Sequence, residues 1–367
     1  MTTQPQPEAP FFFFHLPRTA GTTLNAILKD NFAPEEVLSV YRREDYAACR
    51  ELEVERLNRL RLIQGHLMPQ SLYPPTLYGR PVRIFTFLRE PVSRLISEYR
   101  FLRTWPRNHM YAYLNENNIS FEHYLTGKEH QLCLRGSNFM THALAGKFKN
   151  IDDAEALERA KDRLENAFCC FGIQERFDES LLLLAKTLGL TRLFYERRNV
   201  LRKDASLPPL TDKDKKLAAE LNQADTALYA FAVDLLERRI AEEGPAFAKR
   251  VETFRVVNGK FQNVCELMAR KLQIREDGAI IRPKSSGAPP LPQHILEEGP
   301  PLLAREDYEN VFSRFAAKRL GLSPRPPSLP LRAFSFEKGT TWGRGTAPPG
   351  HPERKNAFFR KTTGRMV

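Results

Sequence analysis

The sequence predicts an α/β fold in which a P-loop-like parallel sheet is flanked by helices, and two segments carry this prediction. Each begins with a short apolar run and continues through a turn into apolar residues at helical spacing. The first run is FFFF at residues 11–14, and its helix begins near Gly21. The second is VRIFTFL at residues 82–88, and its helix begins near Pro91. Apolar runs without polar alternation are typical of strands that are buried on both faces of a parallel sheet.

The loop between the first strand and its helix has the residue types of an anion-binding site. Gly21 is expected to let the backbone turn sharply, and Thr22 and Thr23 place hydroxyls at the start of the helix. Unpaired N–H groups and the helix dipole favour a phosphate or sulfate there, and Arg18 adds a positive charge. The loop is not a Walker A loop, because Arg18 precedes its single glycine and G-K-[ST] is missing. An ordinary strand-to-helix turn is the alternative interpretation.

A second anion site is predicted where the second strand ends. Arg89 follows this strand directly, and Ser97 lies about two turns into the next helix. A guanidinium and a hydroxyl placed in this way can hold a second phosphate group. The alternative is a helix cap beside a solvated arginine.

His66 is expected at the carboxyl edge of the sheet. It follows a short apolar run at residues 61–65, which predicts a third strand. Open α/β sheets bind their ligands at this edge, so His66 becomes a candidate functional residue. A structural histidine is the alternative.

The remaining pattern predicts helices around the sheet and one more strand. Leucine spacing in residues 34–60 indicates a helix on the outside of the sheet, and FCCFGI at residues 168–173 indicates another buried strand. Asp178 is expected to cap a helix that Gly189 ends. Further helices are predicted at residues 151–165 and 225–240.

The composition favours one domain followed by a basic tail. The chain has 367 residues and a formal net charge of +12, but residues 310–367 alone hold 12 Lys and Arg against two Glu. Of the 27 prolines, 13 lie within residues 283–352, where they disfavour packed helices and sheet. We therefore predict a flexible leader at residues 1–10, a domain at 11–282, and a mostly disordered, Pro-rich tail at 283–367. The tail's charge suits acidic surfaces, and its sparse aromatic residues do not indicate specific nucleic-acid binding.

The five cysteines indicate neither a zinc site nor a disulfide framework, because their number is odd and no C-x-x-C pair occurs. This usage fits a reducing compartment. The only apolar run near the N-terminus is too short for a secretory signal, and no stretch has the length of a transmembrane helix. We therefore expect a soluble, cytoplasmic protein.

Two segments together resemble a known enzyme family. HLPRTAGTTL at residues 15–24 and FLREPVSRLISEYRF at residues 87–101 are similar to the two nucleotide-binding signatures of sulfotransferases that use 3′-phosphoadenosine 5′-phosphosulfate (PAPS). The carbohydrate sulfotransferases of heparan sulfate 2-O and 6-O sulfation, and their bacterial relatives, are the most similar. The resemblance continues more weakly through NFMTHALAG, FGIQERFDESLLLL and DTALY, and it covers about residues 10–240.

The resemblance implies the sulfotransferase fold, PAPS as the sulfuryl donor, a carbohydrate or glycan acceptor, and no requirement for a metal. It assigns Arg89 and Ser97 to the 3′-phosphate. It assigns the 5′-phosphosulfate to a loop whose residues are Arg18, Thr19, Ala20, Gly21, Thr22 and Thr23. Arg18 stands where lysine is usual, and Glu90 where aspartate is commoner. His142, where relatives often carry arginine, receives no role, and RKTTG at residues 360–364 is discounted as a nucleotide motif because it lies in the tail.

Sulfuryl transfer requires positioning, charge stabilisation and a base for the acceptor hydroxyl. Arg18 is predicted to stabilise charge on the departing oxygen. Histidine is the natural base near neutral pH, and the heparan sulfate enzymes are understood to use one between the two motifs, so we predict His66, with Glu98 and Glu175 as alternatives. Acceptor identity would depend on loops such as residues 105–118. A P-loop-type kinase or NTPase and a non-catalytic anion-binding protein are the two alternative functions.

Overall fold

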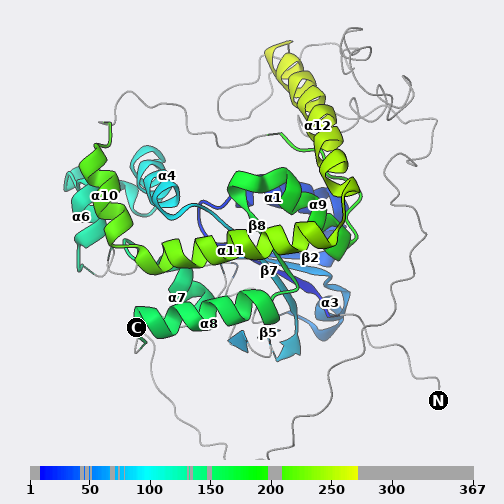
Figure 1. Ribbon diagram of the computed structural model, residues 1–367, viewed down its shortest axis with the longest axis horizontal. Helices are drawn as coiled ribbons and strands as arrows, with labels where there is room; N and C mark the ends of the chain where they lie inside the picture. The colour runs from blue at the N-terminus through cyan, green and yellow to red at the C-terminus, as the bar shows by residue number, and fades with distance from the viewer. Residues whose placement is uncertain are drawn as a thin grey trace, which may run out of the picture. The chain divides into compact units, whose positions relative to one another are not determined.

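The computed structural model describes residues 9–41, 45, 49, 52–66, 71–72, 75–77, 79–129, 132, 135–146, 151–196 and 209–271 (Figure 1). Most of the predicted leader, and the whole tail from residue 283 with its RKTTG segment, lie outside these residues. The domain boundaries therefore stay predictions.

A five-stranded parallel sheet forms the core of the described chain, in the order β2-β3-β1-β7-β8. This confirms the predicted fold class and the strands expected from the apolar runs. The strands are β1 (Phe11–Phe14), β2 (Val37–Val40), β3 (Leu62–Gly65), β7 (Arg83–Leu88) and β8 (Cys170–Ile173). β1 lies in the middle and pairs with both β3 and β7.

Strand β2 was not predicted, and the expectation that residues 34–60 form only an outer helix is wrong for their first part. Pro34–Glu36 forms a 3-10 turn, β2 pairs with β3, and a short helix, α3 (Val54–Arg59), follows later. The strand VLSV is short, stands among acidic residues and contains Ser39. Ser39 is stabilised within the sheet because its hydroxyl accepts a hydrogen bond of 2.8 Å from Gln64 of β3.

One face of the sheet packs against three helices. Phe12 and Phe14 of β1 join a buried cluster with side chains of α7 (Phe139–Ala145), α8 (Asp153–Asn166) and α11 (Gln223–Glu242). The predicted helices at residues 151–165 and 225–240 are thereby confirmed. The residues of α11 that face this cluster include Leu228, Ala232, Leu235 and Leu236.

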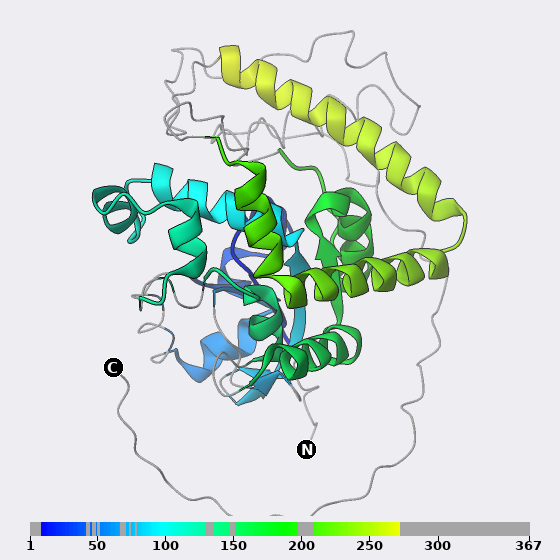
Figure 2. The same ribbon diagram turned by 60° about the vertical axis from the view of Figure 1, so that its left-hand side comes forward.

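The other face of the sheet packs against α1 (Gly21–Asn31) and α9 (Phe177–Leu188). Phe13 of β1 stacks on Phe85 of β7, with 5.1 Å between ring centroids, and Phe177 of α9 lies 5.5 Å from Phe87. Figures 1 and 2 show α1 and α9 on one side of the sheet, and α7 and α8 on the other. α12 (Ala246–Lys271) packs against α9.

The helix after β7, α4 (Pro91–Thr104), belongs to a second apolar cluster. It packs with α5 (Tyr111–Glu116), α6 (Phe121–Thr126) and α10 (Asp212–Glu220). Three short antiparallel strands, β4 (Ser71–Leu72), β5 (Pro75–Leu77) and β6 (Arg80–Pro81), form a separate small sheet. No helix among the described residues is long and apolar enough to span a membrane.

Asp178 does not cap α9, so this prediction is wrong. Arg176 is the N-cap residue of α9 and makes no side-chain cap. The Asp178 carboxylate instead accepts hydrogen bonds from the Tyr195 hydroxyl at 2.7 Å and from Arg255 of α12 at 3.3 Å. Gly189 ends the helix as predicted, in a left-handed conformation with φ of 68°.

The weaker motifs NFMTHALAG and DTALY meet in a buried polar network. Asp225 of α11 accepts hydrogen bonds from the backbone N–H groups of Met140 and Thr141, at 3.1 and 2.7 Å, and so caps α7. Asn138 accepts in turn from the backbone N–H of Asp225 at 3.1 Å. Because all these groups are buried, the network fixes α7 against α11.

We predict that Asp225→Ala lowers the free energy of unfolding by about 3 kcal/mol, because two buried N–H groups lose their acceptor. Chemical denaturation measured by circular dichroism checks this value. Asp234→Ala, at an exposed position of the same helix, is the control and should change stability by less than about 0.5 kcal/mol. Equal effects of the two substitutions would show that the network contributes little.

Candidate functional site

Three strand ends meet at the predicted site. In the paired register, Phe14 of β1 lies beside Gly65 of β3 and Thr86 of β7. The chain after these strands therefore begins side by side, with His15, His66 and Arg89 close to one sheet edge. The strand order changes direction at β1, and ligands of open α/β sheets bind at such a point.

The loop from Pro17 to α1 turns at residues other than the glycine. Arg18 and Ala20 have positive φ angles of 67° and 65°, while Gly21 is the first residue of α1. The expectation that Gly21 makes the turn is therefore wrong. Its lack of a side chain serves packing, because a Cβ at Gly21 would lie 1.7 Å from Nε2 of His15.

The two helix N-termini at this edge differ in their caps. Glu90 caps α4, because its carboxylate accepts hydrogen bonds from Val92 and Ser93 N–H at 2.9 and 2.7 Å. The N-cap of α1 is Ala20, which has no side chain that can accept, and no side-chain cap is formed. The dipole of α1 favours an anion at this end of the helix, where the anion site stays a prediction.

Arg18 links the two predicted anion sites into one. Its Nε donates a hydrogen bond of 3.1 Å to the Ser97 hydroxyl, and its guanidinium lies 4.6 Å from the centroid of the Phe101 ring. Arg89 donates from Nη1 to the backbone carbonyl of Arg18 at 3.1 Å. Arg18 was assigned to the 5′-phosphosulfate, and Arg89 and Ser97 to the 3′-phosphate. All three thus lie in one connected group.

This group of side chains carries concentrated positive charge. Burial lowers the pKa of Arg18, and the charge of Arg89 lowers it further. Both guanidinium groups stay protonated at neutral pH, and Glu98 and Glu175 offset part of their repulsion. A bound anion would offset more of it. Nε of Arg89 is also buried without a hydrogen-bond partner. These features favour a ligand with more than one negative charge.

The threonines of the loop have different environments. Thr19 is fully buried and donates its hydroxyl to the Leu16 carbonyl at 2.8 Å, so its side chain holds the loop in shape. Thr22 is exposed at the start of α1, and Thr23 is buried. The assignment of this loop to a 5′-phosphosulfate stays a prediction. Since the Thr19 side chain is bonded within the loop, only the Thr19 backbone is left for the ligand in that prediction.

His66 lies in an aromatic cluster that the sequence did not reveal. Its Nδ1 donates a hydrogen bond of 2.8 Å to the backbone carbonyl of His15, since a carbonyl can only accept. The two imidazole centroids are 4.6 Å apart, and the Tyr41 ring lies at 5.1 Å from His66. The His66 side chain is exposed, yet desolvation by the surrounding groups lowers its pKa, against the opposing effects of this hydrogen bond and of Glu98.

The alternative bases are engaged in ion pairs. Glu98 is buried, and its two oxygens accept from Arg94 and Arg135 at 2.7 and 2.9 Å. Glu175 accepts from the Tyr229 hydroxyl at 3.0 Å and lies 3.9 Å from Nε of Arg89. These contacts occupy the oxygens of both carboxylates, so His66 stays the predicted base. His142, which received no role, pairs with Asp153 of α8 at 2.7 Å.

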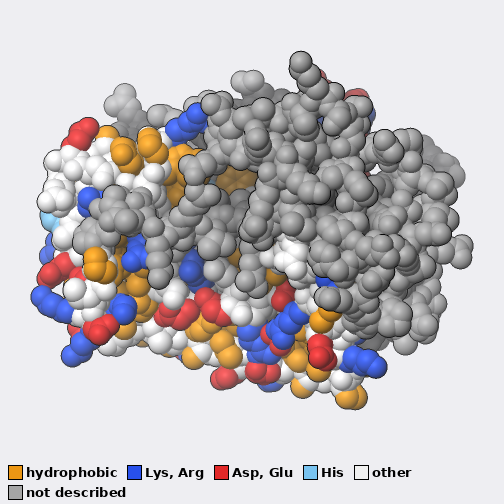
Figure 3. Space-filling view, turned by 90° about the horizontal axis from the view of Figure 1, so that it is seen from above, with side chains coloured by type: hydrophobic (Ala, Val, Ile, Leu, Met, Phe, Trp, Pro, Cys, Tyr) orange, Lys and Arg blue, Asp and Glu red, His pale blue; other side chains and the backbone are white. Residues whose placement is uncertain are grey.

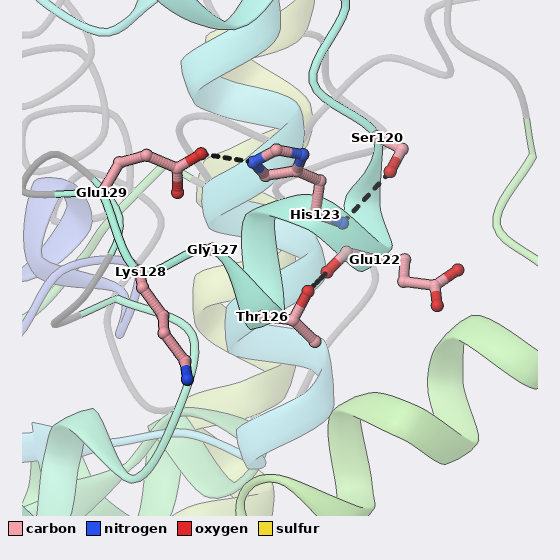
Figure 4. A pocket seen from close by; sticks show the side chains of 7 residues that line it. All are labelled: Ser120, Glu122, His123, Thr126, Gly127, Lys128 and Glu129. Atoms are coloured by element: carbon pink, nitrogen blue, oxygen red, sulfur yellow. Dashed lines mark hydrogen bonds and ion pairs between the residues drawn. The ribbon is translucent and has the colours of Figure 1, made fainter.

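A separate surface hollow lies on α6. It is lined by Ser120, Glu122, His123, Thr126, Gly127, Lys128 and Glu129, and Figure 4 shows His123 directed toward Glu129. No residue of the predicted site lines it. On the side of the molecule where α4, α6 and α10 lie, Figure 3 shows hydrophobic side chains exposed beside Lys and Arg. Trp105 at the end of α4 is one described residue of this kind, 46% exposed and in contact with the Phe101 ring.

Comparison with known proteins gives the family. A family model described as galactose-3-O-sulfotransferase matches residues 2–286. The chain belongs to the galactose-3-O-sulfotransferase family. The predicted resemblance to carbohydrate sulfotransferases is thereby confirmed, and the family is the one named for galactose.

Individual relatives are more distant. The chain is similar to galactose-3-O-sulfotransferase 3 of Mus musculus, with 27% identity over 263 residues that cover 65% of this chain and 58% of the relative. It therefore spans less than two thirds of that protein's length. Among solved structures, the mouse sulfotransferase SULT7A1 complexed with PAP matches with a TM-score of 0.29 and 12% identity, over 59% of this chain and 66% of the other. A TM-score of that size does not establish a shared fold.

We predict that Arg89→Ala weakens 3′-phosphoadenosine 5′-phosphate at least tenfold and adenosine 5′-phosphosulfate much less, because one charge-assisted contact to the 3′-phosphate is lost. Isothermal titration calorimetry checks both affinities. Arg59→Ala removes an exposed arginine of α3 and should leave them unchanged. Equal losses for both ligands in Arg89→Ala would remove the assignment of Arg89 to the 3′-phosphate.

Proposed function

We propose that this chain transfers a sulfuryl group from PAPS to the 3-hydroxyl of a galactose residue in a glycan. The uncapped N-terminus of α1, flanked by Arg18 and Arg89, is the observation that carries the proposal. Family membership supplies the reaction class, and the name of the mouse relative suggests galactose as the acceptor.

The residues present fit such a donor. A nucleotide with phosphates at both the 3′ and 5′ positions needs two groups of positive or N–H donors, and the site offers them. The start of α1 with Thr22 and Thr23 suits the 5′ end. The buried Nε of Arg89, which lacks a hydrogen-bond partner, suits the 3′-phosphate, and Ser97 retains a hydroxyl proton to donate.

When bound, the donor supplies a sulfuryl group in transferable form. The protein's contribution is then positioning and charge stabilisation, as in phosphoryl transfer. The α1 N–H groups hold the anionic end against the loop, and Arg18 offsets negative charge that develops there. Arg18 is kept in place by Ser97 and by the Phe101 ring, so little ordering is required during the reaction.

His66 is the proposed base for the acceptor hydroxyl. Because Nδ1 donates to the His15 carbonyl, the lone pair of the neutral ring is on Nε2, which can accept a proton. The pKa of His66 is lowered, so the ring is neutral at pH 7 and its basic form is present. No metal is required by this proposal.

We predict that His66→Ala lowers kcat by roughly two to four orders of magnitude and leaves the affinity for 3′-phosphoadenosine 5′-phosphate nearly unchanged. The wild-type rate should fall as His66 becomes protonated. Because the pKa of His66 is lowered, this fall should occur at a pH below the ordinary histidine value of 6.5. This acidic limb should vanish in the variant. His123→Ala, outside the site on α6, is the control. A near-normal rate in His66→Ala would transfer the role to Glu98 or Glu175.

The reaction itself is tested with labelled PAPS and a panel of β-galactosides. We expect transfer to the unmodified galactoside and to its 6-O-methyl derivative, and at least a hundredfold less to its 3-O-methyl derivative, which lacks the accepting hydroxyl. Titration with ATP is the control for a kinase or NTPase. Tighter binding of ATP than of 3′-phosphoadenosine 5′-phosphate, or donor binding without transfer to any glycan, would contradict the proposal.

A further inference from the structure

His15 lies against the start of α1 in an orientation that the predicted chemistry does not use. It follows β1 directly, and its ring occupies the space beside Gly21. Of the ring atoms, Nε2 is nearest to the position of a Gly21 Cβ, at 1.7 Å, against 2.2 and 2.3 Å for the neighbouring carbons. Nε2 is thus the part of His15 that borders the first turn of α1.

The other ring nitrogen of His15 lies at hydrogen-bond distance from Tyr41, which is in turn bonded to Asn25. Nδ2 of Asn25 donates to the Tyr41 hydroxyl at 2.7 Å, and this hydroxyl lies 3.2 Å from Nδ1 of His15. Because the amide N–H can only donate, the Tyr41 oxygen accepts from Asn25, and the Tyr41 proton remains for Nδ1. If Nδ1 accepts that proton, a neutral ring carries its own proton on Nε2.

Rotating the Asn25 amide would reverse this chain of donors. Oδ1 would accept from Tyr41, and His15 would donate from Nδ1, with its lone pair on Nε2. In the observed orientation the buried Oδ1 of Asn25 has no partner. The reversed orientation would instead leave the two amide N–H donors buried without an acceptor, which is the rarer and more costly arrangement. The donor chain from Asn25 to His15 is therefore favoured.

The charge state agrees with this assignment. Burial holds the pKa of His15 well below 6.5, and the nearby His66 and Arg18 lower it further. Burial also raises the pKa of Tyr41, so its hydroxyl keeps the proton that it donates. His15 is consequently a neutral ring with one N–H donor at physiological pH.

We propose that His15 donates a hydrogen bond from Nε2 to the anionic 5′ end of the nucleotide at the start of α1. This inference rests on the proposed function and adds a donor to its anion site. The two neighbouring histidines then have opposite tautomers and separate tasks. His66 carries its proton on Nδ1 and accepts at Nε2, while His15 accepts at Nδ1 and donates from Nε2.

The tautomer is measured directly by nuclear magnetic resonance on protein labelled with ¹⁵N in its histidines. We expect His15 to carry its proton on Nε2 between pH 6 and 8 in the ligand-free protein. In Tyr41→Phe, which removes only the hydroxyl, this preference should weaken. A wild-type His15 protonated on Nδ1, or on both nitrogens, would overturn the inference.

Binding is measured with two ligands that differ at the 5′ end. His15→Phe keeps a ring but removes the donor, and we expect it to weaken 3′-phosphoadenosine 5′-phosphate about ten- to hundredfold, as for loss of a charge-assisted hydrogen bond. Adenosine 3′-phosphate, which lacks the 5′ group, should be little affected. His15→Gln, whose amide N–H can replace Nε2–H, should restore most of the affinity.

The outcomes separate this inference from the proposed function. If the wild-type protein does not bind 3′-phosphoadenosine 5′-phosphate, the proposed function fails. If it binds and His15→Phe weakens both ligands equally, or neither, His15 has only a packing role. Should His15→Phe fail to fold, Tyr41→Phe decides, because the inference requires it to weaken the 5′-phosphorylated ligand selectively.

Discussion

The pairing of β1 with both β3 and β7 is the constraint on which the site depends. A parallel register places the ends of neighbouring strands at one edge, so residues far apart in sequence become neighbours there. His15, His66 and Arg89 each follow one of these strands directly. The three apolar runs form buried strands, and their pairing therefore also positions the three polar residues that follow them.

The loop after β1 is strained, and the surrounding contacts hold it. Left-handed conformations at Arg18 and Ala20 cost about 1–2 kcal/mol each, because neither residue is a glycine. The Thr19 hydroxyl bonded to Leu16 and the Arg89 contact to the Arg18 carbonyl offset part of this cost. An anion bound at α1 would stabilise the same conformation, since it would screen Arg18 from Arg89.

Local patterns were sufficient for most of the fold and for the position of the two motifs at strand-to-helix junctions. Apolar runs mark β1, β7 and β8, and the order of strand, small residues and helix predicts an anion loop. Contacts between distant residues could not be predicted. Nothing in the sequence shows that Ser97 accepts from Arg18, that Asp178 bonds to Tyr195 instead of capping α9, or that Gly21 makes room for a ring. β2 was missed because a strand at the sheet edge can be short and partly polar.

The two histidines differ in what fixes their protons, and this makes their roles separable. The tautomer of His66 depends on the backbone carbonyl of residue 15, an acceptor that any substitution at that position retains. The tautomer of His15 depends on the side chains of Asn25 and Tyr41, which substitution can remove. In the proposed arrangement, a change at Tyr41 would therefore act on the His15 donor, while the hydrogen bond from His66 to the residue 15 carbonyl would persist. Since the residue that follows β1 supplies both the His15 ring and that carbonyl, the proposed anion binding and proton acceptance would depend on different groups of one residue.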